Sequence, residues 1–439
     1  MALIRGMHRS VLAAAVVSCT AASTMAYADD ATEQRIAQLE RQVALLLSKL
    51  EQHEASVEVS TEFLDVNEAR TMHEEMRPMS PNTKFTYGGF ISLNALATNY
   101  SDGKPASPLI DDLLVPSLIP TGGDSSYSTT NIHAKQSRFL FGTETKTDAG
   151  VFSSRVELDF MIGGQGDERI SNSYAARIRQ AYVDWNYGSG SLLAGQAWST
   201  FHDVSTLPYF VDFVGPAGTV FNRQAMVRWS TGNWQFAAEN PRTRLNGVAH
   251  DDFNSSYMPD LVARYKTKTG NMNWSVAGIL RTLSYDDRNT GMDDSAQGYG
   301  ISGSGKYTLE GGHDIRMQLS YGDALGRYLG LNMFNDGYVD INGDVETFDQ
   351  MGGYLAYRHL WSQAWESSIG YSYSAADNPS DVDSSSWAKE YHSFHANLKY
   401  KPAPGLWIGG EYIYASKELE NGDKGDLDRI QMAVQYSFK

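Results

Sequence analysis

Near its end the chain reads Ile430-Gln431-Met432-Ala433-Val434-Gln435-Tyr436-Ser437-Phe438. Large apolar side chains occupy every second position, and glutamine, alanine or serine fills the positions between them. Because side chains alternate between the two faces of a β-strand, one face of this segment suits lipid and the other suits water. The stretch predicts a membrane-spanning strand, with Phe438 facing lipid or a subunit interface.

The same period of two recurs upstream, in segments that include 152–160, 273–281, 315–321 and 393–400. One segment departs from it, because Arg177 and Arg179 share the parity of the apolar positions that follow them. We expect either a β-bulge there or a position of both arginines above the membrane.

The connections between these segments fall into two classes. Seven are short and rich in turn-forming residues: 148–150, 188–190, 231–233, 269–271, 310–312, 362–364 and 402–405. Eight are long and polar: about 101–131, 162–175, 199–222, 242–258, 284–295, 324–346, 377–388 and 419–426. Since the two classes alternate strictly, we predict an all-β transmembrane barrel of about 16 antiparallel strands over residues 84–439. The short turns should face the periplasm and the long loops the exterior.

The N-terminus has the pattern of a signal peptide over residues 1–28. Arg5 and Arg9 precede an apolar run, and Ala26-Tyr27-Ala28 is a suitable cleavage site. Cys19, the one cysteine, also permits interpretation as a lipoprotein signal, but the cleavage site that follows favours ordinary export. We therefore expect a mature chain without thiol chemistry.

Residues 29–56 contain a short heptad pattern, which predicts a periplasmic α-helical coiled coil. The seam consists of Ile36, Leu39, Val43, Leu46 and Leu50, spaced 3, 4, 3 and 4 apart. This heptad chemistry alone leans towards a dimer, and the alternative is a single amphipathic helix packed on another surface. The acidic stretch 57–83 is expected to be a linker.

Composition excludes several function classes. The formal net charge is -16, which argues against a nucleic-acid partner, and no apolar run is long enough for a spanning helix. The motif Gly298-x-Gly300-x-x-Gly303 lies within an alternating strand pattern, so it does not predict a nucleotide site. Asp340, Asn342, Asp344 and Glu346 resemble part of a calcium loop, but a solvated acidic loop is the preferred interpretation. We expect no enzyme activity, no metal and no cofactor.

The inward face of the predicted barrel carries the functional information. Parity places more basic than acidic side chains in the lumen, although the protein as a whole is acidic. The basic positions are Arg138, Arg155, Arg228, Arg264, Lys266, Arg281, Lys306, Arg316, Arg358 and Lys399. The inward acids are Glu157, Asp159, Asp184, Glu239, Asp260, Glu366 and Glu411. A basic excess in a narrow lumen favours anions, whereas complete pairing would only hold the barrel in shape.

The third long connection carries a family resemblance. It contains Gln196-Ala197-Trp198-Ser199-Thr200-Phe201, Pro208, Asp212-Phe213-Val214-Gly215-Pro216-Ala217-Gly218 and Arg223-Gln224. With the signal peptide, the heptads and the strand count, the mature chain resembles the DcaP-like trimeric outer-membrane porins. The resemblance implies a homotrimer in outer-membrane lipid, a periplasmic coiled coil and uptake of small anionic solutes such as dicarboxylates.

The same resemblance implies that loop 199–222 folds inward as a constriction. Its apolar residues suit packing on the wall, and Asp203, Asp212, Phe213 and Gly215 are the candidate constriction residues. An aromatic-ended last strand is similar to those that serve recognition by the barrel assembly machinery, with Lys439 as a small departure. We expect a passive porin; the alternative is a structural protein that tethers the outer membrane through its coiled coil.

Overall fold

The computed structural model describes residues 82–161, 172–248, 257–287, 291–331 and 333–438. The predicted signal peptide, coiled coil and most of the linker lie outside these residues. The described residues contain four short 3-10 helices, at Pro108–Asp111 (η1), Pro116–Leu118 (η2), Val204–Thr206 (η4) and Glu310–Gly312 (η6). None of the helices in the described part of the chain is long and apolar enough to cross a membrane.

The described residues form one large antiparallel sheet and one small mixed sheet. Strands of the large sheet are β1 (Thr83–Tyr100), β2 (Tyr127–His133), β3 (Arg138–Thr147), β4 (Gly150–Asp159), β5 (Arg177–Asn186), β6 (Ser191–Trp198), β7 (Arg223–Thr231), β8 (Trp234–Glu239), β10 (Asp260–Thr269), β11 (Met272–Asp287), β12 (Met292–Thr308), β13 (Asp314–Asp323), β16 (Asp349–Leu360), β17 (Trp365–Ala376), β18 (Ala388–Ala403), β19 (Leu406–Leu419) and β20 (Lys424–Phe438). The small sheet contains β9 (Leu245–Asn246), β14 (Gly337–Val339) and β15 (Val345–Thr347).

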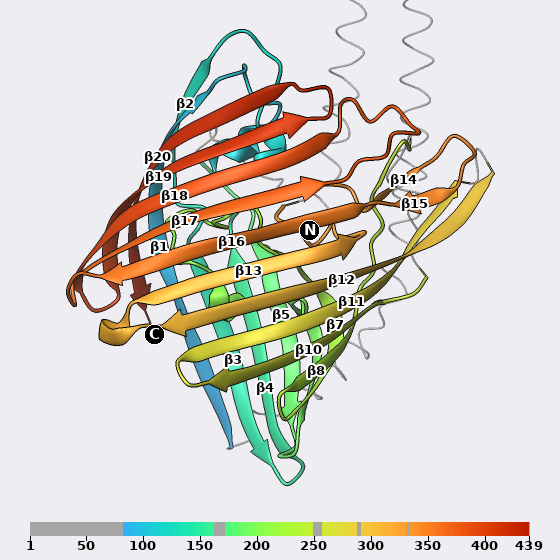
Figure 1. Ribbon diagram of the computed structural model, residues 1–439. Coiled ribbons are helices and arrows are strands. Elements are labelled where there is room, and N and C mark those ends of the chain that lie inside the picture. The colour runs from blue at the N-terminus through green and yellow to red at the C-terminus, as the bar shows by residue number, and fades with distance from the viewer. Residues whose placement is uncertain (1–81, 162–171, 249–256, 288–290, 332, 439) are drawn as a thin grey trace, which may run out of the picture. The chain divides into compact units, whose positions relative to one another are not determined.

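The large sheet closes into a barrel of sixteen antiparallel strands, which confirms the prediction. Consecutive strands lie side by side (Figure 1), and the last strand, β20, pairs with the first, β1, from Gly89↔Phe438 to Tyr100↔Leu427. Segments β2 and β3 together form the second barrel strand, since both pair with β1. Closure leaves no unpaired sheet edge, which is the condition for a sheet to span a bilayer.

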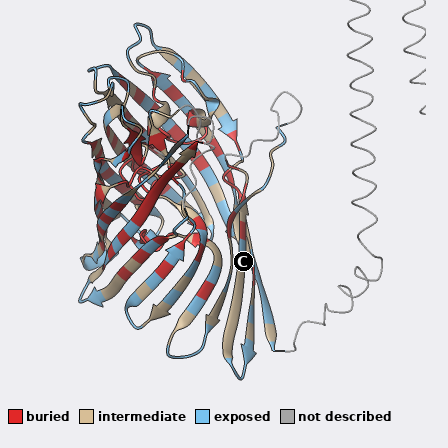
Figure 2. Ribbon diagram, turned by 90° about the vertical axis from the view of Figure 1, so that its right-hand side faces the viewer, coloured by how far each residue is buried: buried red, intermediate tan, exposed pale blue. Residues whose placement is uncertain are grey.

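Alternation between the two faces follows the sequence pattern (Figure 2). On β20, Ile430, Met432 and Tyr436 are 51%, 51% and 54% exposed, whereas Gln431 between them is fully buried. Phe438 belongs to the outer row, where its ring lies 6.2 Å from that of Phe139. The outer surface is thus apolar, and the buried core consists of inward side chains and of the loops that they contact.

Segment β5 contains the bulge that the parity of its arginines had suggested. The register between β4 and β5 shifts after Glu157↔Gln180, so that Leu158 pairs with Ile178. Because one residue is inserted, Arg177 and Arg179 turn to the inner face, while Val183 remains exposed on the outside.

Two of the predicted long loops are shorter than expected. β11 extends to Asp287 and β12 begins at Met292, although 284–295 was expected to be a loop. Similarly, β19 reaches Leu419 and β20 begins at Lys424, within the predicted loop 419–426. The prediction was wrong here because a strand can continue beyond the lipid. Its polar end residues still pair with the neighbouring strand, and their side chains contact water or other loops. Leu283 and Tyr285, for example, are buried in a cluster that includes loop residues.

The glycines of the apparent nucleotide motif have a packing role. Gly298 and Gly300 face inward on β12, where added Cβ atoms would lie 2.4 Å from Ala324 and 2.6 Å from Leu325. Gly303 faces outward, and a Cβ there would meet nothing within 4 Å. The inner pair therefore gives space to the loop that begins at residue 324.

Candidate functional site

Loop 3, residues 199–222 between β6 and β7, lies inside the barrel. The Val211 N–H donates to the carboxylate of Glu411 on β19 (2.5 Å), and the Val220 N–H donates to Gln318 on β13 (3.1 Å). Both partners are inward side chains of strands far from β6 in the sheet order. The structure thus places this loop across the lumen, where the family resemblance had implied a constriction.

Asp203 fixes the first part of loop 3 to the wall. Its carboxylate accepts hydrogen bonds from Lys266 on β10 (2.9 Å) and Ser275 on β11 (3.0 Å). Burial favours a higher pKa for Asp203, but the hydrogen bonds from Ser205 and Lys266 outweigh it and hold the pKa well below its usual range. The group therefore stays ionised and anchors the loop at neutral pH.

Asp212 orders the tip of loop 3. Its side chain accepts hydrogen bonds from the N–H groups of Val214 (3.0 Å) and Gly215 (2.9 Å), and from that of Leu114 (2.9 Å) in loop 1, residues 101–126 between β1 and β2. Gly215 has a φ of 88°, in the left-handed region that favours glycine. Within the described part of the chain, Asp212 forms no ion pair with an arginine; it stabilises the turn.

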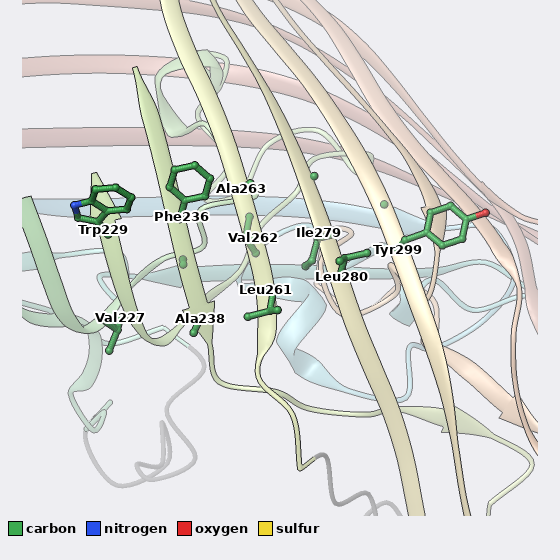
Figure 3. Close-up of a pocket in the computed structure, with 13 residues that line it drawn as sticks. Val227, Trp229, Phe236, Ala238, Leu261, Val262, Ala263, Ile279, Leu280 and Tyr299 are labelled. Carbon is green, nitrogen blue, oxygen red and sulfur yellow. The ribbon is translucent and has the colours of Figure 1, made fainter. Parts of the chain in front are cut away.

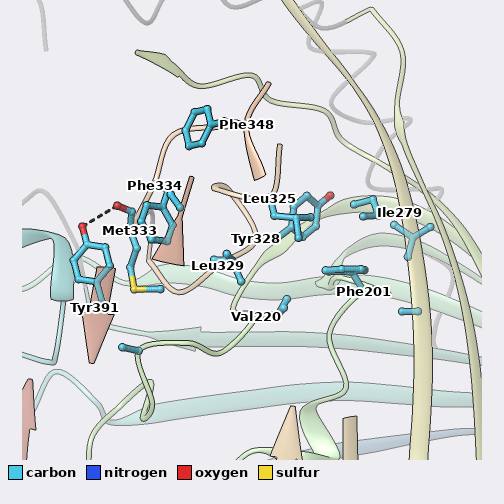
Figure 4. Close-up of a cluster of buried hydrophobic side chains, with 14 of the residues drawn as sticks. Phe201, Val220, Ile279, Leu325, Tyr328, Leu329, Met333, Phe334, Phe348 and Tyr391 are labelled. Atoms are coloured by element: carbon cyan, nitrogen blue, oxygen red, sulfur yellow. Dashed lines mark hydrogen bonds between the residues drawn. The ribbon is translucent and has the colours of Figure 1, made fainter. Parts of the chain in front are cut away.

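Loops 1 and 6 also fold inward, although the sequence had been interpreted as placing them outside. Loop 6 is the connection between β13 and β16. Its residues Leu325, Tyr328 and Leu329 are fully buried, and Leu329 forms a β-bridge with Val220 of loop 3. Figure 4 shows these side chains gathered with Phe201 in one cluster. The signal that could have been used was the apolar content of both loops, which is unusual for a solvated rim.

Loop 1 forms a second cluster inside the barrel. Ile110 and Leu113 are fully buried and Leu114 is 1% exposed, and they pack with Val214 of loop 3. The lumen is therefore narrowed by three loops in mutual contact rather than by loop 3 alone.

A group of arginines faces the aromatic tip of loop 3. The Phe213 ring centroid lies 6.0 Å from the guanidinium of Arg138, 5.8 Å from that of Arg177 and 5.1 Å from that of Arg179. Arg223 lies over Trp198 at 4.6 Å. Arginine suits such a wall because its planar cation stacks on rings and presents a fork of donors to a carboxylate.

The carboxylates near this arginine wall do not balance it. Glu157 pairs with Arg138 (3.4 Å), Arg155 (2.8 Å) and Arg179 (2.7 Å). Asp159 pairs with Arg177 and again with Arg179, both at 2.7 Å. With Arg223, five guanidinium groups thus accompany two carboxylates among the described residues. Among the described residues, the wall therefore carries more positive than negative charge.

Three of the predicted lumenal arginines hold loops instead of facing an open passage. Arg281 is 2% exposed and pairs with Asp336 (2.6 Å) and Asp260 (3.3 Å). Arg264 and Arg316 are 7% and 5% exposed and donate to main-chain carbonyls of loop 3. The predicted ladder is corrected accordingly, because parity gives the face of a strand but not what covers that face.

Lys399 is also buried, at 6% exposure, and donates to the Phe210 carbonyl of loop 3 (2.8 Å). The remaining predicted basic residues are partly exposed on the inner face. The side chains of Arg138, Arg155 and Lys306 are 26%, 39% and 27% exposed, and Arg228 is also partly exposed. Arg228 forms no ion pair with a carboxylate in the described ranges. These residues, together with Arg177 and Arg223, are accessible to a passing solute.

The sequence of the chain matches the family model described as DcaP outer membrane protein over residues 17–438. The chain belongs to the DcaP outer membrane protein family. Its place in the outer membrane and its closed barrel of sixteen strands make it an outer-membrane channel protein of this family.

Two solved structures show the fold of this DcaP-family chain. The crystal structure of the outer membrane channel DcaP of Acinetobacter baumannii has a TM-score of 0.69 and 19% identity, and the match covers 82% of this chain and 99% of that one. An anion-selective porin from Comamonas acidovorans has a TM-score of 0.52 and 10% identity, with 81% and 100% covered. No curated protein matches the chain in sequence.

Several lumenal residues of this DcaP-family protein were not assigned from its sequence. The break in parity left the position of Arg177 and Arg179 open, and Arg223 was not among the predicted inward residues. Arg429 is 1% exposed and donates to Thr98 (2.9 Å) and to the Ile110 carbonyl, so it holds loop 1. Its inward parity with Gln431 was the signal that could have located it.

A depression of about 700 Å³ lies on the outer surface, away from the lumen (Figure 3). Exposed apolar side chains surround it, among them Trp229, Phe236, Leu261, Leu280 and Tyr299. Its lining is almost entirely apolar, as expected for a surface in contact with lipid. It therefore plays no part in the passage.

Proposed function

We propose that the protein is a passive diffusion channel that favours small anionic solutes, such as dicarboxylates. The observation that carries the proposal is the positive excess of the arginine wall opposite Phe213. Fixed cations in a narrow, low-dielectric passage raise the local concentration of anions. Transport of this kind needs no catalytic residue, and we propose no enzyme activity.

Reversal potentials in planar bilayers test the selectivity. Under a salt gradient the wild type should pass anions better than cations. Arg138→Gln, Arg223→Gln and Arg228→Gln together should reduce or reverse that preference, because these side chains are accessible and the last two lack an ion pair with a described carboxylate. The matched control removes three exposed charges at strand ends, with Lys84→Gln, Lys389→Gln and Lys424→Gln, and should leave the preference unchanged.

A cation-selective wild type would contradict the proposal, because it would show that the acidic loops determine the electrostatic potential along the passage. The same recordings separate a channel from the structural tether considered from the sequence. A folded protein without single-channel conductance would favour the tether.

We further propose a homotrimer with the seam Ile36, Leu39, Val43, Leu46 and Leu50 in the periplasm. This assembly rests on the family resemblance and the heptads, and the seam lies outside the described residues. Barrel contacts should carry most of the association, because isolated helices of this length are marginal. Native mass measurement after deletion of residues 29–56 should still find trimers; monomers would contradict this.

A further inference from the structure

A polar cavity lies among the loops at the extracellular end of the barrel. It has a volume of about 390 Å³, within the usual range for small-molecule sites. Its lining comes from loops 1 and 6, from loop 4 (between β8 and β10), from loop 7 (between β17 and β18) and from the loop-side ends of β18 and β19. The arginine wall is not part of it, so a solute bound here is in a separate site.

Amide side chains supply most of the polar groups of the cavity. Asn335 donates its amide to the Asn246 side-chain oxygen (2.7 Å). Asn378 donates to the Ala388 carbonyl and to Glu420, both at 2.9 Å. Among the described residues, these bonds leave the Asn246 amide N–H groups and the side-chain oxygens of Asn335 and Asn378 without partners. The cavity thus offers both donors and acceptors, the combination that hydroxyl groups match.

Lys417 brings the one charge among the twelve described residues that line the cavity. Its ammonium donates to the Ser117 carbonyl at 3.0 Å and forms no ion pair with a described carboxylate. An ammonium carries three donors, so two remain for a ligand. In a strongly acidic protein, an unpaired lysine within a cavity is a specific attraction for a carboxylate.

Aromatic side chains complete the lining and are already held in place. The centroid of the Trp387 ring lies 6.2 Å from that of Phe348, and the centroid of the Tyr391 ring lies 5.3 Å from that of Phe334. Figure 4 shows the rings of Tyr391 and Phe334. The Tyr391 hydroxyl also donates to the Met333 carbonyl (2.9 Å). Fixed ring faces can pack against the C–H groups of a ligand without a further loss of side-chain entropy.

We propose that this cavity is a binding site for a small hydroxylated carboxylate of the size of a sugar acid. Lys417 binds the carboxylate, Asn246, Asn335 and Asn378 exchange hydrogen bonds with hydroxyl groups, and the aromatic faces contact the carbon skeleton. The site captures the solute at the extracellular end before it reaches the arginine wall. Binding is weak, because a channel must also release what it admits.

Equilibrium binding of D-glucuronate to the full-length protein in detergent tests the proposal, with calorimetry and tryptophan fluorescence as readouts. Two matched probes separate the contributions: D-glucose lacks the charge, and cyclohexanecarboxylate lacks the hydroxyl groups. Glucuronate should bind at least about tenfold more tightly than either probe, since a charge-assisted hydrogen bond contributes on this scale.

Variants then assign the site. Lys417→Gln should weaken glucuronate binding by about tenfold, and Asn335→Leu should weaken it while leaving cyclohexanecarboxylate unaffected. The control is Lys424→Gln, which removes a nearby charge that is 67% exposed and paired with Glu418; binding should not change. Heat modifiability on gels verifies that each variant forms a barrel.

Glucose binding as tight as that of glucuronate, unchanged affinity in folded Lys417→Gln, or no glucuronate binding at millimolar concentration would each overturn the proposal. These outcomes do not depend on lumenal selectivity, because binding is measured without transport. The reversal potentials described above test that selectivity independently.

Discussion

The backbone of Gly218 in loop 3 lies against the backbone of Gly353 on β16. A Cβ atom on residue 218 would lie 2.5 Å from the Gly353 carbonyl oxygen and 2.6 Å from its nitrogen. Gly218 itself donates its N–H to Ser372 on β17 (3.3 Å). A glycine is required at this position by the close approach of loop 3 to the wall.

Gly218→Ala should displace loop 3 from the wall, because the obstructing atoms are backbone atoms and cannot rotate away. The expected loss of stability is about 1–3 kcal/mol, with increased current noise in single-channel recordings. Denaturant unfolding measures the first effect. Gly303→Ala is the control, since a Cβ there meets nothing within 4 Å; an equal effect of both substitutions would contradict the packing argument.

Arg281→Met should release loop 6, because it leaves Asp336 buried without its ion pair and Asp260 with only the longer ion pair to Arg327 (3.7 Å) among the described residues. Removing one partner of a buried ion pair typically costs about 3–5 kcal/mol. We expect a lower unfolding midpoint and faster proteolysis within loop 6. Lys306→Gln should be nearly neutral, since that lysine is 27% exposed and 3.9 Å from Asp314. If loop 6 of the Arg281 variant is cleaved at the same rate as that of the wild type, Arg281 does not anchor the loop.

His202 should make the stability of loop 3 sensitive to acid. Burial, helped by the positive charge of Arg264, lowers the pKa of His202 to about 3, and both ring nitrogens lack hydrogen-bond partners among the described residues. The unfolded chain takes up a proton near pH 6.5, whereas the folded chain resists it. The contribution of neutral His202 to the free energy of unfolding is therefore fully present above pH 6.5. It is lost as the pH falls towards 3, by at most about 1.4 kcal/mol per pH unit.

Unfolding midpoints at pH 7, 5 and 4 measure this effect. His202→Phe should have a flatter pH dependence than the wild type, because the neutral ring cannot be protonated. His392→Gln changes a side chain that is 32% exposed and should retain the wild-type dependence. If His202→Phe loses stability with acid as steeply as the wild type, other groups are responsible.

Phe213→Ala should widen the passage beside the arginine wall. The substitution removes a ring that contacts three guanidinium groups, with a loss of roughly 1–2 kcal/mol from cation–π interactions. Single-channel conductance should rise while the preference for anions persists. Phe85→Ala removes a ring from the outer surface, where Phe85 is 53% exposed, and should leave conductance unchanged. Equal conductance of the Phe213 variant and the wild type would place the narrowest point elsewhere.

The sequence by itself determined the closed barrel and the inward position of most of the basic residues. The period of two along strands such as β20 and the alternation of short and long connections were enough, because a lipid exterior imposes strict alternation on every spanning strand. The irregularity at Arg177 and Arg179 was visible as a break in parity, and the structure decided for a bulge rather than a position above the membrane.

Only the tertiary structure decided what each inward residue does. Arg138 and Arg281 have the same inward parity, yet the first lies beside the passage and the second is buried with Asp260 of β10 and Asp336 of loop 6. The difference arises from contacts between residues far apart in the chain, such as the bridge between Val220 and Leu329. Local periodicity reports the face of a strand, but the packing of loops over that face depends on the whole closed barrel.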